Sequence, residues 1–371
     1  MLASLESQGF IVESDGSLLP TQLDKGAIRD LHRQACAARI EQARSSLERQ
    51  ESRLLDLFAR GTEVRPDRIQ PILCEVTAGS EEELLFRYAR LHWSVPVSAG
   101  YGRRLRFLVF DDSNGKLIGL FGLGDPVFRL HARDAWIGWD HGRRLERLRH
   151  IMDAFVLGAV PPYSLLLCGK LIAMLVTSDQ VRAAFQRKYG SRTSMISERC
   201  FDGRLALITT ASALGRSSLY NRIRYHDRTL YHNVGWTSGS GEFQFSNGVY
   251  DDLLAFAQRH CTPTAKHKLW GTGWRSRREL VRKVLPQLGL PRELVYHGIR
   301  RQIYAAPLAE NARDFFAPRL KNLASIRARS PISSTGFANA GCCLVPRGTD
   351  DTRSSNPTCF DSGRGADRRG S

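Results

Sequence analysis

The chain has 371 residues, 42% of them hydrophobic and 25% charged, a balance that supports a sizeable core without disulfides. No segment approaches the roughly 20 consecutive apolar residues of a membrane-spanning helix, and the first residues do not predict a secretory signal. With 54 Lys and Arg against 37 Asp and Glu, the formal net charge is +17. That charge favours nucleic acid as a partner, and an arginine-rich solvated surface is the alternative.

The eight cysteines are scattered along the chain. None of them stands in a cluster with the spacing of zinc ligands. We therefore expect reduced thiols, no metal site and no disulfides, as is usual for a protein of the cytoplasm.

The first quarter of the chain is predicted to be mostly helical. Residues 1–22 show turn signals and little periodicity, which predicts a flexible leader. From Asp24 to about Gly61, apolar residues recur at helical spacing and indicate one long helix or a helical hairpin. Residues 69–76 predict a short strand, and Ser80 followed by three glutamates predicts a capped helix that ends near Trp93.

The middle of the chain predicts a sheet with helical crossovers. Apolar segments at 104–110 and 116–123 flank Asn114-Gly115, a strong hairpin signal. The later expected elements share apolar periodicity of either helical or strand type. Strands are expected at 134–139, 154–160, 205–210, 230–236 and 243–245, and helices at 169–189, 217–225, 278–288 and 311–326.

A buried strand, a proline-containing loop and a helix start follow one another over residues 153–176. The start of a helix offers unpaired backbone N–H groups and a positive dipole end, which suit a pyrophosphate. The candidate cofactor-binding residues there are Leu167, Cys168, Gly169 and Lys170. The alternative is a strand–loop–helix crossover that binds no ligand.

This order of elements resembles the acetyl-CoA loop of the GCN5-related N-acetyltransferases. In that family the strand–loop–helix is followed by a strand and a tyrosine-bearing helix, which here corresponds to Tyr220 after residues 205–210. The resemblance implies acetyl-CoA as cofactor and Tyr220 as the general acid of acyl transfer. The alternative for Tyr220 is a core residue with a satisfied hydroxyl.

Longer segments resemble the DruA-like family of Druantia anti-phage defence proteins. They include LLFRY (84–88), GYGRRLRF (100–107), LGDPVF (123–128), MDAFVLGAVPPY (152–163) and TTASALGRSSLYNR (209–222). The resemblance covers about residues 24–315 and implies a part in anti-phage defence alongside other proteins of a defence locus. Where the family tends to have GWGHFH, this chain has GSGEFQ at 239–244, so no role of those histidines carries over.

Two arginine-rich loops are the candidate nucleic-acid contacts. Before the hairpin, Tyr101 is placed to stack a base beside three arginines that suit phosphates, namely Arg103, Arg104 and Arg106. In the second loop, Arg216 and Arg222 follow the strand at 205–210 and suit bidentate phosphate contacts. A turn with solvated arginines is the alternative for the first loop, and helix capping by Ser217 and Ser218 is the alternative in the second.

Four acidic residues in one region raise the alternative of a metal-dependent nuclease. They are Asp125, Asp134, Asp140 and Asp153. Their spacing resembles no nuclease motif, and Asp125-Pro126 is an ordinary turn pair. No metal site is therefore predicted.

Together the patterns predict an α/β (α+β) protein with an acetyltransferase-like, mixed and mainly antiparallel sheet flanked by helices. The expected division is a leader at 1–22, an N-terminal helical region at 23–95, an α/β core at 96–326 and a disordered tail at 327–371. The expected function is an anti-phage defence protein that binds nucleic acid or a defence partner through a basic surface. An acyl-CoA-dependent N-acyltransferase and a transposon-associated DNA-binding or nuclease protein are the alternatives, so enzymatic activity stays open.

Overall fold

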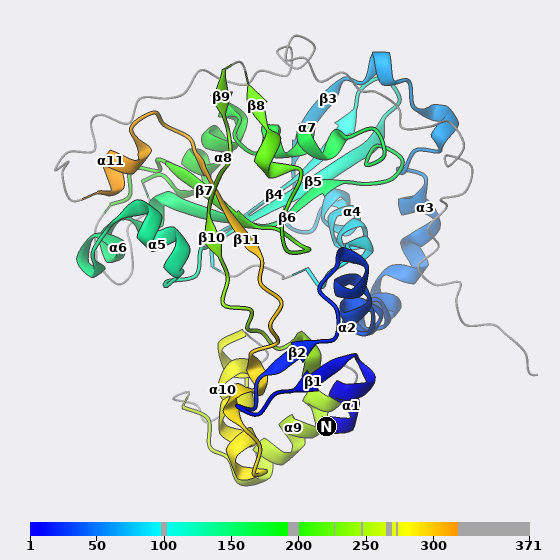
Figure 1. Cartoon of the computed structure of the whole chain (residues 1–371). Helices are drawn as coiled ribbons and strands as arrows, with labels where there is room; N and C mark the ends of the chain where they lie inside the picture. The colour runs from blue at the N-terminus through cyan, green and yellow to red at the C-terminus, as the bar shows by residue number, and fades with distance from the viewer. Residues whose placement is uncertain are drawn as a thin grey trace, which may run out of the picture.

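The computed structural model describes residues 1–97, 102–191, 200–225, 227–245, 248–264, 269–271 and 274–317. Within these residues the largest element is a seven-stranded sheet, in the order β10-β11-β7-β6-β5-β4-β3. Its strands are β3 (Pro71–Glu75), β4 (Arg104–Asp111), β5 (Lys116–Gly124), β6 (Ile151–Ala159), β7 (Leu207–Ala211), β10 (His232–Trp236) and β11 (Gln302–Pro307). Helices flank both faces of the sheet (Figure 1), which confirms the predicted mixed α+β class.

Neighbouring strands of the sheet pair antiparallel, except that β6 and β7 run parallel. The predicted hairpin is confirmed as β4 and β5. Its loop is closed by a hydrogen bond of 2.7 Å from the Gly115 N–H to the carbonyl oxygen of Asp111. Gly115 has a φ of +70°, a conformation that glycine adopts without steric cost.

The helices form a layer on each face of the sheet. On one face, α7 (Cys168–Leu175) and α8 (Asp179–Tyr189) cover a core that includes Phe107, Met152 and Ile208. The other face is covered in two parts (Figure 1). Toward β3 these are α2 (Lys25–Leu47), α3 (Glu51–Leu55) and α4 (Glu81–Ala89), and toward β10 they are α5 (His131–Ile137), α6 (His141–Arg147) and α11 (Ala312–Phe316).

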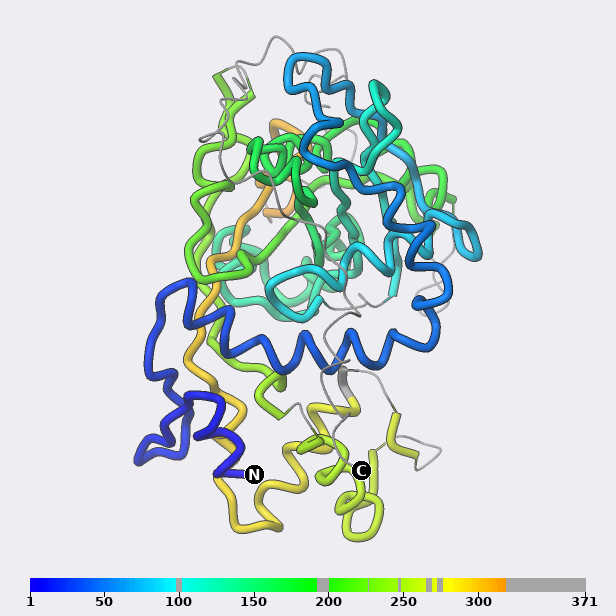
Figure 2. The backbone as a smooth tube through the Cα atoms, turned by 90° about the vertical axis from the view of Figure 1, so that its right-hand side faces the viewer, coloured from blue at the N-terminus to red at the C-terminus, as the bar shows by residue number. Residues whose placement is uncertain are grey.

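A small lobe lies below the sheet in Figure 1, and α2 runs between the two in Figure 2. We use this name for α1 (Leu2–Ser7), β1 (Phe10–Val12), β2 (Leu18–Pro20), α9 (Val249–His260) and α10 (Trp274–Gln287). Its own core contains Leu5, Phe10 and Leu18 together with Leu253 and Leu280. Residues 1–22, predicted as a flexible leader, form α1, β1 and β2, and their apolar side chains lie in this core.

Several predicted elements differ from the structure. Residues 134–139, expected to form a strand, belong mostly to helix α5, which ends at Gly138 in the left-handed conformation. The single helix expected at 169–189 is broken into α7 and α8, with the Thr177 hydroxyl bonded back to the carbonyl of Met174. Residues 243–245 form a 3-10 helix instead of a strand.

Other segments were shorter than expected or were missed. The brief helix predicted at 217–225 is a 3-10 turn at Tyr220–Arg222 followed by the two-residue strand β8 (Arg224–Tyr225), which pairs with β9 (Arg228–Thr229). Helix α9 and strand β11 were not predicted. The tail predicted at 327–371 lies outside the described residues, as does most of the helix expected at 311–326. Among the helices that the structure describes, none combines the length and apolar character needed to cross a membrane.

Candidate nucleic-acid interface

Arginines from several elements gather on the face of the sheet that carries α4. In β4, Leu105 and Phe107 point into the core beside α7 and α8. Because side chains alternate along a strand, Arg104 and Arg106 lie on the opposite face. There Arg106 donates to Glu83 of α4 at 2.6 Å and its guanidinium lies 5.9 Å from the ring of Phe86.

Arg90 belongs to the short helix that follows α4 and lies near this group. Burial lowers its pKa first, and the positive charges of Arg39, Arg87, Arg106 and Arg104 lower it further. Like charges affect a pKa in this way only at close range. Four arginines from α2, α4 and β4 therefore lie near the half-buried Arg90.

The same positive surface continues into the small lobe. Arg39 of α2 has a pKa lowered by burial and, in smaller part, by the charge of Arg277 on α10. The guanidinium of Arg277 stacks 3.7 Å from the ring centroid of Tyr250 and lies 3.9 Å from the carboxylate of Glu242. We call Arg39, Arg87, Arg90, Arg104, Arg106 and Arg277 the arginine track.

Few acids offset this charge among the described residues. Glu83 pairs with Arg106, and Glu242 faces Arg277 together with Arg278 and Arg282. Burial raises the pKa of Glu242 even so, because desolvation disfavours its charged form more than the arginines favour it. A polyanion that enters this surface would meet more cations than carboxylates.

The structure separates the residues of the first predicted loop. Tyr101 lies outside the described residues. Arg104 is exposed and Arg106 half-buried, and both belong to the arginine track. Arg103 instead pairs with Asp125 at 2.7 Å and donates to the carbonyls of Arg149 and Ile151 at 2.6 and 3.3 Å. Its part in nucleic-acid binding stays a prediction, although its guanidinium is engaged within the protein.

The second predicted loop lies on the other side of the sheet. Arg216 and Arg222 are exposed. The loop that carries them packs through Tyr220 and Ile223 into the core beneath α7 and α8. The structure therefore does not bring these arginines together with Arg104 and Arg106, and their role stays a prediction.

The candidate cofactor loop is tightly packed where it starts α7. Leu167 is exposed and adopts a left-handed φ of +62°, while Cys168 is fully buried. Lys170 is half-buried. A side chain added at Gly169 would approach Leu219 Cδ1 to 2.9 Å, so that leucine covers the glycine. Acetyl-CoA binding at these residues stays a prediction.

Tyr220 lies in an aromatic cluster instead of on the surface. Its ring centroid is 5.1 Å from that of Tyr231 and 5.0 Å from that of Tyr304. Burial is the main cause that raises its pKa to about 12, against a smaller opposite effect of a hydrogen bond with Thr210. A role as general acid stays a prediction, and the packing corresponds to the alternative of a core tyrosine.

The four acids considered for a nuclease have separate partners. Asp125 pairs with Arg103, and Asp140 caps α6 by accepting from the Arg143 N–H at 2.7 Å. Asp153 accepts from the Thr209 hydroxyl at 2.7 Å, and burial raises its pKa. In the part of the chain that is described, no group of three or more His, Cys, Asp or Glu residues could hold a metal ion.

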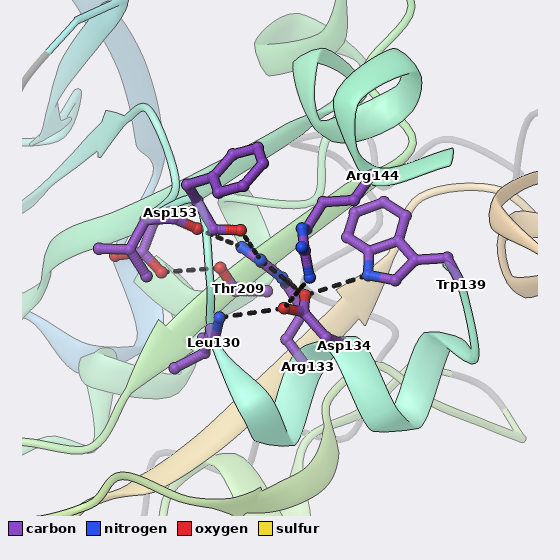
Figure 3. A network of polar contacts seen from close by, with 9 residues as sticks. Leu130, Arg133, Asp134, Trp139, Arg144, Asp153 and Thr209 are labelled. Carbon is purple, nitrogen blue, oxygen red and sulfur yellow. Dashed lines mark hydrogen bonds and ion pairs between the residues drawn. The ribbon is translucent and has the colours of Figure 1, made fainter. Parts of the chain in front are cut away.

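Asp134 organises a buried network around α5 (Figure 3). Its carboxylate accepts from the Leu130 N–H, the Arg133 Nε, the Trp139 Nε1 and the Arg144 guanidinium, at 3.1, 2.8, 3.1 and 3.3 Å. Arg133 is fully buried and also donates to the carbonyls of Val127 and Phe128 at 2.9 and 3.1 Å. The network fixes α5 against the loop that follows β5.

These features define a basic α+β protein whose clustered arginines span a large and a small lobe. A family model described as Druantia protein DruA matches residues 22–317. The chain belongs to this family of anti-phage defence proteins.

Druantia protein DruA from Escherichia coli (strain UMEA 4076-1) is 42% identical over 308 residues, which cover 83% of this chain and 76% of that protein. No solved structure matches the chain. The resemblance to acetyltransferases therefore stays a prediction.

Arg39, Arg90 and Arg277 were not predicted to belong to one surface. Each stands in a helical segment with ordinary amphipathic spacing, where an arginine predicts only a solvated face. The signal that was present is the basic composition of residues 274–287, WRSRRELVRKVLPQ. Residues 274–287 are far from Arg39 in the sequence, so no local pattern indicated that Arg277 lies near Arg39.

Proposed function

We propose that this anti-phage defence protein binds nucleic acid through the arginine track. The observation that supports the proposal is the gathering of like-charged arginines from α2, α4, β4 and α10 with few acids between them. Holding so many cations together is unfavourable unless an anion neutralises them. A track that continues from one lobe to the other suits an extended chain of phosphates better than a single anion.

Binding of this kind has a quantitative signature. Each neutralised phosphate releases counterions, so the logarithm of the affinity falls with the logarithm of salt by about 0.9 per contact on duplex DNA. Four contacts would weaken binding by roughly 100-fold between 50 and 200 mM salt. Contacts to phosphates alone would give little dependence on base sequence.

The test is filter binding of duplex DNA, single-stranded DNA and RNA over a salt series. The double variant Arg39→Gln plus Arg277→Gln removes two members of the arginine track. The double variant Arg187→Gln plus Arg204→Gln is the matched control, because it removes the same charge at two exposed arginines that lie outside the arginine track and outside both predicted loops. We expect the first variant to weaken binding by about 10-fold or more and to reduce the salt slope by about 2.

The control variant should retain the affinity and slope of the unaltered protein, and thermal unfolding should verify that both variants are folded. Equal losses in the two variants would show that overall charge, and not this surface, determines binding. If the unaltered protein binds none of the three nucleic acids, the proposal is wrong. A second protein of the defence locus would then be the expected occupant of the basic surface.

A further inference from the structure

A cavity of about 850 Å³ lies beside α5, between that helix, β10 and α11. Its size falls within the usual range for small-molecule sites. It is distinct from the arginine track, because none of the track arginines lines it. The lining residues that matter for its chemistry are Trp136, Gly138, His232, Glu310, Arg313 and Asp314.

The cavity combines an aromatic surface with a cation. The rings of Trp136 and His232 are nearly parallel, at 25° with centroids 6.3 Å apart. The guanidinium of Arg313 lies 5.1 Å from the centroid of the Trp136 ring. Nucleobases stack on aromatic side chains such as an indole, because every base has a π face.

Two carboxylates complete the lining. Glu310 and Asp314 are both exposed, and Glu310 forms an ion pair with Arg228 at 2.9 Å. An ionised carboxylate is a hydrogen-bond acceptor only. It therefore suits a ligand that brings N–H donors, such as the amino group of a nucleobase.

The wall that carries Trp136 is held firmly. Trp136 belongs to α5, whose neighbouring residues Arg133 and Asp134 form the buried network of Figure 3. At the end of the helix Gly138 adopts a φ of +76°, and a side chain added there would meet no atom within 4 Å. The aromatic face is thus fixed in position while the cavity stays open beside it.

We propose that this cavity binds one unstacked nucleobase, which stacks on Trp136 while Arg313 pairs with its phosphate. The carboxylates of Glu310 and Asp314 favour bases that carry an amino group over uracil or thymine. Binding to a base within a strand rests on the proposed nucleic-acid function. A free nucleotide shares the same chemistry, and the experiment distinguishes the two sources.

The experiment is calorimetry of the full chain with adenosine 5′-monophosphate, uridine 5′-monophosphate and ribose 5-phosphate. Trp136→Ala is compared with Trp236→Ala. Trp236 is 41% exposed and has Arg300 over its ring at 6.0 Å, so it is the same kind of pair outside the cavity. Trp136→Phe keeps an aromatic face and guards against a folding defect in the alanine variant.

We expect the adenine nucleotide to bind more tightly than ribose 5-phosphate, with the uridine nucleotide between them. Loss of a stacking face costs about 5- to 150-fold in affinity per base, so Trp136→Ala should weaken binding by at least the lower figure. Trp236→Ala should leave binding unchanged, and Trp136→Phe should lie close to the unaltered protein. The variant Glu310→Gln plus Asp314→Asn should reduce the preference for adenine over uracil.

Equal binding of the adenine nucleotide and ribose 5-phosphate would overturn the inference, as would an unchanged affinity in Trp136→Ala. A short single strand that binds more tightly than the mononucleotide identifies a strand as the source of the base, and equal affinity identifies a free nucleotide. The Arg39 and Arg277 double variant should leave mononucleotide binding intact. Salt-dependent DNA binding without any mononucleotide binding would therefore remove this inference alone and leave the proposed function standing.

Discussion

The guanidinium of Arg103 lies 2.7 Å from the carboxylate of Asp125 and is turned into the protein. Gly102, directly before it, has a φ of +65°, and a side chain there would collide with the same carboxylate. The rings of Phe185, Tyr189 and Phe201 flank the guanidinium at 5.2, 5.7 and 5.8 Å. Arg103, which the sequence predicted as a nucleic-acid contact, thus links the start of β4 to β5 and β6.

Replacing Arg103 should therefore destabilise the fold. Arg103→Ala removes the charged pair with Asp125 and two bonds to backbone carbonyls, and hydrogen bonds to charged groups are worth about 1.5–3 kcal/mol each at most. We expect the free energy of unfolding in urea to fall by about 2 to 3 kcal/mol. Arg104→Ala, one residue along on the exposed face, is the control and should change it by less than about 0.5 kcal/mol. Equal stabilities would contradict the structural role of Arg103.

Replacing Asp134 should lower the free energy of unfolding more than replacing Arg103 does. Asp134→Asn keeps the size of the side chain but leaves the buried Arg133 and the nearby Arg144 without their counter-ion. Removing one partner of a buried pair typically costs about 3–5 kcal/mol, and we expect a loss near the lower figure in urea unfolding. Asp140→Asn is the control, because asparagine caps a helix about as well as aspartate. A neutral effect of Asp134→Asn would contradict the stabilising role of this network (Figure 3).

Buried histidines predict loss of stability in mild acid. Burial lowers the pKa of His32 to about 3 and that of His297 to about 4, against an ordinary 6.5. The unfolded chain takes up these protons below about pH 6.5 while the folded protein does not. Their contribution is therefore full above that pH and is lost as the pH falls toward the folded values.

The measurement is the free energy of unfolding at pH 7 and pH 5. His297→Leu should flatten the decline by up to about 1.4 kcal/mol per pH unit, since one proton fewer is taken up on unfolding. His32→Leu should act in the same direction. A pH dependence that is as steep in both variants as in the unaltered protein would sink the prediction.

Substitutions of Tyr220 can distinguish a role in core packing from a role as general acid. If the residue serves the core, Tyr220→Phe should cost only about 1 kcal/mol, the net value of the bond with Thr210. Tyr220→Ala should cost about 3–5 kcal/mol, because it empties the space between Tyr231 and Tyr304. Acetyl-CoA-dependent acylation that Tyr220→Phe abolishes would instead establish the general-acid role.

Local patterns in the sequence were enough for much of the sheet. The Asn114-Gly115 turn with apolar strands on either side determines the β4–β5 hairpin, since both signals act between neighbouring residues. The prediction of secondary structure failed where local signals conflict. Residues 136–139, Trp-Ile-Gly-Trp, suggest a strand, but the Asp134 carboxylate bonds to the Leu130 N–H and the left-handed Gly138 closes a helix.

Three properties follow directly from the sequence: the family, the basic character and the alternation that separates Arg104 and Arg106 from the core. Which arginines lie near one another depends on the tertiary structure. Arg39 lies near enough to Arg277 to feel its charge because α2 passes between the sheet and the small lobe, whereas Arg103 contacts Asp125 because β4 and β5 are paired. Periodicity describes the faces of one element, but the pairing of charges depends on how distant elements pack, and no local pattern encodes that.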